Sequence, residues 1–133
     1  MIRTKPLKRR KRIVVKRSTL KNKADALWAA KVKLLKVEND RCELADRHPG
    51  FPCSGPTQAA HGFSRRYLGT RYLPINGFAL CRAAHVYWTH RPLEWDAVLR
   101  AEWGETVYEE LRQRALKGPS TPLDYRLIAD ALR

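Results

Sequence analysis

Positive charge is crowded into the first part of this 133-residue chain, and this uneven distribution limits what the chain can fold into. Residues 1–36 hold fourteen lysines and arginines against one acidic residue, Asp25, which leaves only +1 of the net charge of +14 for the rest. That near-neutral remainder is long enough for one modest core, and 44% of the chain is apolar. We therefore expect a basic arm over residues 1–19 and a single domain over residues 20–133.

The basic arm predicts a polyanionic partner. Each phosphate that a lysine or arginine neutralises releases condensed counterions, which gives affinity without sequence choice. A solubilising tail or a membrane-surface anchor is the alternative interpretation, but the body of the chain also points to nucleic acid, so we expect DNA. The expected contacts are Lys8, Arg9, Arg10, Lys11, Arg12, Lys16, Arg17 and Arg66.

The sequence contains no feature typical of a membrane or secreted protein. It has no apolar run of eighteen residues, and the segment MIRTKPLKRRKRIVV is charged without the apolar stretch of a signal peptide. Three cysteines form no paired framework like that of small secreted domains. We expect a soluble, cytoplasmic protein with reduced thiols and no membrane partner.

A helix with a basic back is expected over residues 22–37. Asn22 and Asp25 are candidates for its N-terminal capping box. Apolar side chains recur at helical spacing and are expected to face the domain, with the tryptophan as a core anchor and not a base-stacking platform. These residues are Ala24, Leu27, Trp28 and Leu35.

The rest of the chain predicts a mostly helical α+β fold. Proline, glycine and serine mark a long loop, and the apolar segments TQAAHGFS and YLPINGFAL predict a two-stranded ribbon with Asn76-Gly77 as a tight turn. We expect a small, irregular ββα core over residues 40–90 and C-terminal helices over residues 92–133. The individual helices are expected over residues 80–89, 92–103, 105–117, and from Thr121, with Pro122 in the first turn, to the end.

Three polar residues in this core stand in an order that suits phosphodiester hydrolysis. The reaction needs a base to deprotonate water, a cation to neutralise charge on the phosphate, and a group that holds the base in position. His61 on the first strand would be the base, His85 on the following helix a metal ligand, and Asn76 the brace of the intervening loop. Histidines that are merely satisfied polar residues are the alternative interpretation.

Several segments resemble successive blocks of phage HNH endonucleases of the NinG (Rap) recombination type, over residues 20–117. The resemblance implies a ββα-metal nuclease that uses Mg²⁺ or Mn²⁺ on branched or single-strand-containing DNA, in the cytoplasm of a bacterial host. By position, His61 matches the general base, Asn76 the motif asparagine and His85 a metal-side residue. Arg65 matches a contact to the scissile phosphate, which suits its planar guanidinium. The segments are LKNKADALWAAKV, CELA, AAHGFSRR, NGFALCRAAHVYWTHRPLEW and GETVYEELRQRA.

The first departure from this family concerns zinc. Relatives usually carry two Cys-x-x-Cys knuckles that bind a structural zinc, whereas here Ala45 and Ala84 replace one cysteine of each. A closed zinc site normally needs four ligands. We therefore expect a zinc-free knuckle in which the remaining thiols pack as small apolar groups. The alternative is a substitute zinc site with ligands from Cys42, Cys53 or His48, and Cys81.

The second departure is Ala60, which stands where many such nucleases place a second metal ligand, Asp or His. Some relatives have glycine there, and His90 or Glu94 are alternative ligands. A catalytically degenerate HNH-derived protein that binds DNA or RNA, or a basic ribosome-associated protein, therefore remains as an alternative function. Junction-cutting enzymes usually act as dimers, so a homodimer is compatible with the endonuclease, although no dimer face is visible in the sequence.

Overall fold

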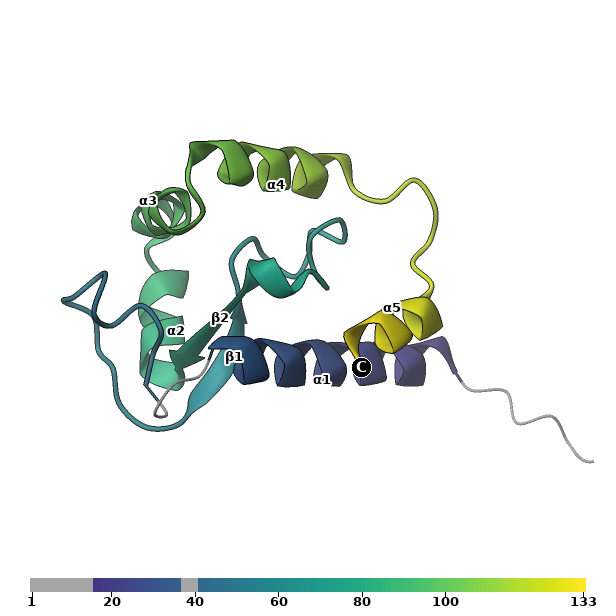
Figure 1. Ribbon diagram of the computed structural model, residues 1–133, viewed down its shortest axis with the longest axis horizontal. Helices are drawn as coiled ribbons and strands as arrows, with labels where there is room; N and C mark the ends of the chain where they lie inside the picture. Colours follow the sequence, from purple (N-terminus) through teal and green to yellow (C-terminus); the bar gives the residue numbers. More distant parts are fainter. Residues whose placement is uncertain (1–15, 37–40) are drawn as a thin grey trace, which may run out of the picture.

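The structure, a computed structural model, describes residues 16–36 and 41–133. Across these residues the chain forms five α-helices and one two-stranded sheet (Figure 1), which confirms the mostly helical α+β class. The predicted contacts at Lys8 to Arg12 lie outside the described residues. The elements are α1 (Arg17–Lys36), β1 (Thr57–His61), the 3₁₀ turn Pro74–Asn76, β2 (Gly77–Cys81), α2 (Arg82–Thr89), α3 (Pro92–Trp103), α4 (Glu105–Lys117) and α5 (Tyr125–Leu132).

None of the helices in residues 16–36 and 41–133 combines the length and the apolar character that crossing a membrane requires.

The predicted ribbon is confirmed, but its turn is not where the sequence placed it. β1 and β2 pair antiparallel from Thr57 opposite Cys81 to His61 opposite Gly77. The long segment 62–76 joins them, so Asn76-Gly77 is no tight turn, and Gly77 has an extended backbone with φ of −107°. Glycine is required there because α1 crosses close to the strand: a Cβ at Gly77 would overlap the side chain of Val32.

Helix α1 presents one buried row of side chains to the ribbon. Ala24, Trp28 and Val32 are buried at intervals of four residues, whereas Leu35 is 58% exposed, so the prediction that Leu35 lies on this face was wrong. The helix also begins at Arg17, five residues before the expected start. Asn22 therefore lies inside the helix and does not cap it.

The helices enclose two hydrophobic clusters, one on each side of the ribbon. The first joins β2, α2, α3 and α4 through Phe78, Leu80, Trp88, Leu99 and Tyr108. The second joins α1, the loop residue Tyr72 and α5, which lies against α1 in Figure 1. The ribbon lies between the two clusters, so a residue at its edge can contact both.

The C-terminal helices follow the sequence prediction with one exception. α3 and α4 have the predicted bounds, and Gly104 separates them with φ of +76°, a conformation that glycine adopts without strain. α5 begins four residues later than predicted, because Asp124 and not Thr121 caps it. The Asp124 carboxylate accepts hydrogen bonds from the backbone N–H groups of Arg126 and Leu127.

The close approach of α1 to β2 gives a testable prediction. Gly77→Ala should lower the free energy of unfolding by roughly 1–3 kcal/mol, because the added methyl group overpacks the contact with Val32. Urea unfolding of Gly77→Ala, Val32→Ala and the double variant measures this. The double variant should be more stable than the sum of the two single effects implies, since Val32→Ala makes room for the methyl group. Additive effects would contradict the packing described.

Candidate functional site

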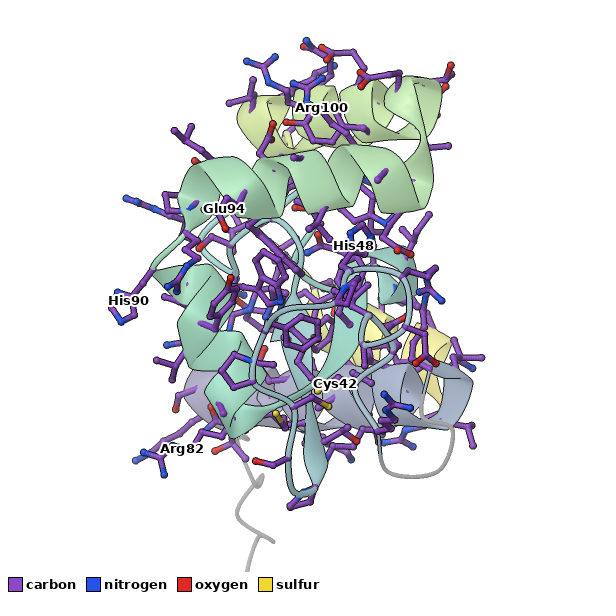
Figure 2. All side chains as sticks on the ribbon, turned by 90° about the vertical axis from the view of Figure 1, so that its left-hand side faces the viewer. Cys42, His48, Arg82, His90, Glu94 and Arg100 are labelled. Atoms are coloured by element: carbon purple, nitrogen blue, oxygen red, sulfur yellow. The ribbon has the colours of Figure 1, made fainter. Side chains whose placement is uncertain are left out.

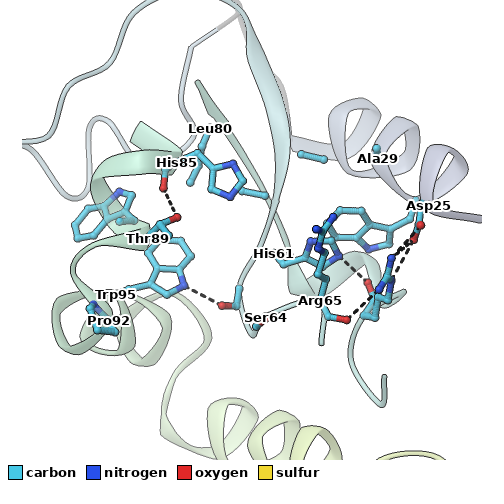
Figure 3. A pocket seen from close by; sticks show the side chains of 16 residues that line it. Asp25, Ala29, His61, Ser64, Arg65, Leu80, His85, Thr89, Pro92 and Trp95 are labelled. Atoms are coloured by element: carbon cyan, nitrogen blue, oxygen red, sulfur yellow. Dashed lines mark hydrogen bonds and ion pairs between the residues drawn. The ribbon is translucent and has the colours of Figure 1, made fainter. Parts of the chain in front are cut away.

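A cleft of about 740 Å³ opens between α1, the ribbon and the α2–α3 pair (Figure 3). Its walls carry several of the residues that the sequence singled out: His61, Arg65 and His85 all line it. Asp25 of α1 lies on the side of His61 away from His85 in Figure 3, and Trp28 of the same helix also lines the cleft. The histidines of the predicted hydrolytic site are therefore brought to one cavity.

The imidazole of His61 is held on two sides. Its ring stacks on the indole of Trp28 with a centroid distance of 3.9 Å and an interplanar angle of 8°. Its Nε2 lies 3.2 Å from the backbone carbonyl oxygen of Arg71. A carbonyl only accepts, so Nε2 must carry the proton, and the neutral ring keeps its lone pair on Nδ1. Burial lowers the pKa of His61 to about 4, so the ring is neutral near pH 7.

Arg71 holds this carbonyl in place, and sequence reasoning missed this residue. Its buried guanidinium donates to both carboxylate oxygens of Asp25, with distances of 2.9 to 3.1 Å. A further N–H donates to the backbone carbonyl of Arg65 at 3.2 Å. Asp25, expected to cap α1, thus joins the helix to the loop that contacts His61. The sequence feature that could have indicated this role is that Asp25 is the single acidic residue among residues 1–36.

Asn76 closes the loop that follows β1. Its side-chain amide accepts from the N–H of Phe63 at 2.8 Å and donates to the C=O of Phe63 at 3.0 Å. Its backbone carbonyl accepts from the N–H of Gly62 at 2.7 Å. Asn76 is fully buried. These hydrogen bonds join the loop to the strand that ends with His61.

His85 reaches the cleft from α2 and has a partner that sequence reasoning missed. The side-chain amide of Gln58 on β1 lies 3.1 Å from His85 Nδ1. The Gln58 amide nitrogen donates to Nδ1, so Nδ1 accepts and Nε2 of the neutral ring carries the proton. Burial lowers the pKa of His85, which favours the neutral ring. The one sequence feature that could have indicated this contact is the alternation of side chains along β1, which places Gln58 and Ala59 on opposite sides.

The other predicted nucleic-acid and metal residues are spread over the surface. Arg65 and Arg66 are exposed, and of the two only Arg65 lines the cleft. His90 is exposed at the end of α2 and points away from the protein in Figure 2, so it is not brought to His85. Glu94 also does not line the cleft. Arg17 lies over the ring of Tyr125, 4.6 Å from its centre.

The cleft does not fit a resident Mg²⁺ or Mn²⁺ ion. These ions prefer oxygen ligands, above all carboxylates. Asp25 is the one carboxylate among the residues that line the cleft, and both of its oxygens are bonded to Arg71. Ala60 offers no ligand atom. Among the described residues that line the cleft, the remaining metal-binding side chains are the imidazoles of His61 and His85, which offer nitrogen and not oxygen.

A second group of ligand-type side chains lies outside the cleft. The sulfur atoms of Cys42, Cys53 and Cys81 lie within 4.8 Å of one another, with Cys42 and Cys81 buried and Cys53 exposed. Burial raises the pKa of Cys42 to about 12. Burial alone would raise the pKa of Cys81 as well, but N–H groups directed at its sulfur, including that of Ser54, lower it. The three thiols thus form a compact cluster.

His48 is not part of this cluster. Its Nε2 lies 2.9 Å from a carboxylate oxygen of Glu102 on α3, which also pairs with Arg47. Of the two candidates for a third ligand, His48 and Cys53, the structure places Cys53 beside the other two thiols.

Comparison of the chain with protein-family models, with curated proteins and with solved structures finds no match. The resemblance to HNH endonucleases therefore rests on the sequence segments quoted above.

The low pKa of His61 predicts a pH-dependent stability. The unfolded chain takes up this proton near pH 6.5 and the folded chain only near pH 4, so stability should fall as the pH drops through this window. Between pH 7.5 and pH 5, the free energy of unfolding of wild type should fall by roughly 1 kcal/mol more than that of His61→Gln, after allowance for partial solvent exposure of the ring. Urea unfolding of both proteins at the two pH values measures this. An equal loss in the two proteins would contradict a buried, neutral His61.

Proposed function

We propose that this protein is an HNH-type DNA endonuclease that hydrolyses a phosphodiester bond in the cleft, with branched or single-strand-containing DNA as its substrate. One observation carries the proposal: His61 is held as a neutral imidazole with its lone pair on Nδ1, in the same cleft as His85 and Arg65. The order β1, loop, β2, α2 places these side chains around one cavity.

The chemistry assigned to the chain's own residues is limited to what these contacts support. His61 takes a proton from the attacking water through Nδ1, while the Arg71 carbonyl stabilises the imidazolium that forms by accepting from Nε2. The planar guanidinium of Arg65 contacts phosphate oxygens. Asn76 keeps the loop after β1 in place, so that the base stays oriented.

DNA reaches this cleft with the help of the basic arm. Residues 1–36 carry nearly all of the net charge, and Lys16 and Arg17 stand at the point where the described chain begins. Helix α1, which continues the arm, forms one wall of the cleft through Asp25 and Trp28. Electrostatic attraction along the arm would therefore bring a phosphate backbone to the helix that supports His61.

A second candidate function is nucleic-acid binding without catalysis. The lack of cation ligands in the cleft favours it, because both carboxylate oxygens of Asp25 are bonded to Arg71 and Ala60 cannot bind a cation. The pKa of His61, about 4, also makes this ring a weaker base than one that titrates near pH 7. Both candidate functions use the arm and the cleft, but only the endonuclease hydrolyses DNA.

His61→Ala separates them. Wild type should cut supercoiled or branched DNA in the presence of Mg²⁺ or Mn²⁺, and the variant should be slower by roughly a hundredfold to ten-thousandfold, the usual contribution of a general base. DNA affinity should change little, since the base acts in the transition state. Cleavage is measured on gels and affinity by fluorescence anisotropy.

His90→Ala is the matched control for this experiment, because it removes an exposed histidine that does not line the cleft. It should cut like wild type. Cleavage by His61→Ala at the wild-type rate would remove the mechanism. Tight DNA binding without any cleavage by wild type, with either cation, would establish the non-catalytic alternative.

The arm has its own test. Deleting residues 1–15 leaves α1 intact and should weaken DNA binding and its dependence on salt. If about six arm charges contact phosphates, the slope of log affinity against log salt should fall by roughly five units. An arm with the same residues in scrambled order should behave like wild type, because this binding depends on charge and not on order. An unchanged slope after deletion would show that the arm does not contact DNA.

A further inference from the structure

Three cysteines from separate parts of the chain meet near one end of the ribbon, and His61 lies at the other end. Cys42 and Cys53 lie in the loop 41–56 that precedes β1, and Cys81 ends β2 and caps α2. All three sulfurs lie within 4.8 Å of one another, and all three thiols are free. Packing alone does not account for Cys53, which is exposed and still lies against two buried thiols.

The surroundings of the sulfurs suit thiolates. The N–H of Ser54 lies 3.5 Å and that of Ala84 3.4 Å from the Cys81 sulfur, and the N–H of Cys81 lies 3.1 Å from the Cys42 sulfur. Backbone N–H groups directed at sulfur orient metal-bound cysteines and stabilise their charge. Three thiolates close together select a soft cation over a hard one such as Mg²⁺.

The site has no fourth protein ligand among the described residues. Cys42, Cys53 and Cys81 form the one group of three or more metal-binding side chains found within residues 16–36 and 41–133. His48, the nearest alternative in the sequence, is bonded to Glu102. Because Cys53 is exposed while the other two thiols are buried, solvent reaches the cluster from the loop side.

We propose that Cys42, Cys53 and Cys81 bind one Zn²⁺ ion as three thiolates, with a fourth position open to water or to a small external ligand. Binding releases the three thiol protons to the solvent, including the one that Cys81 donates to the carbonyl of Pro52 at 3.7 Å. The ion ties the loop to the start of α2, the helix that carries His85. This site differs from the closed four-cysteine site of the resembling family, whose second cysteines are Ala45 and Ala84 here, and it does not depend on the proposed cleavage of DNA.

Zinc binding is tested on the full chain after removal of metals with chelator. Wild type, equilibrated with Zn²⁺ and passed through gel filtration, should retain one zinc per chain by elemental analysis and should melt at a higher temperature than the metal-free protein. Cys53→Ser should lose the stoichiometric zinc and the thermal shift, and should still fold, because Cys53 is exposed and outside both clusters. Ser54→Ala is the matched control and should retain zinc, since only its backbone N–H is used.

The open position is tested with Co²⁺ in place of zinc. The wild-type complex should show sulfur-to-cobalt charge-transfer absorption, and its visible spectrum should shift when imidazole is added. A visible spectrum that does not respond to imidazole would overturn the open fourth position. Zinc contents that are equal in wild type and Cys53→Ser, or a wild type that retains none, would overturn the site itself.

Discussion

The contact of helix α1 with the loop and strand around His61 is the interaction on which the candidate site depends. Trp28 stacks on the His61 ring and donates its indole N–H to the carbonyl of Leu73 at 2.9 Å. One turn earlier, Asp25 binds the guanidinium of Arg71, whose own carbonyl faces His61 Nε2. Without α1, the imidazole would lose its stacking partner and the anchor of its hydrogen-bond acceptor.

This contact also places His61 at the boundary between the two hydrophobic clusters. One cluster belongs to α2, α3 and α4, and the other to α1 and α5. The ribbon is shared by both, and residues of both clusters line the cleft. The position buries His61 enough to keep it neutral, but leaves room beside it for a ligand. The same burial makes the ring a weak base, so the site combines good orientation with modest basicity.

The sequence predicted what local patterns determine and failed where distant contacts decide. α3 and α4 have the bounds that the sequence predicted, and the ribbon was predicted from its short apolar segments. The role of Gly77 was misread because its reason is the approach of Val32 across the fold and not a turn. Arg71 and Gln58 were missed, since nothing near them in the chain indicates that one binds Asp25 and the other His85. For the same reason, the sequence alone does not decide whether Cys53 or His48 lies beside Cys42 and Cys81.

The tautomer of His61 tests this account most directly. Long-range ¹H–¹⁵N NMR spectra of the ¹⁵N-labelled protein at pH 7 distinguish a protonated Nε2 from a protonated Nδ1, with His61→Gln used for assignment. The account predicts a neutral ring with the proton on Nε2 and the lone pair on Nδ1, because the Arg71 carbonyl can only accept. A proton on Nδ1, or a ring that is partly charged at pH 7, would contradict it.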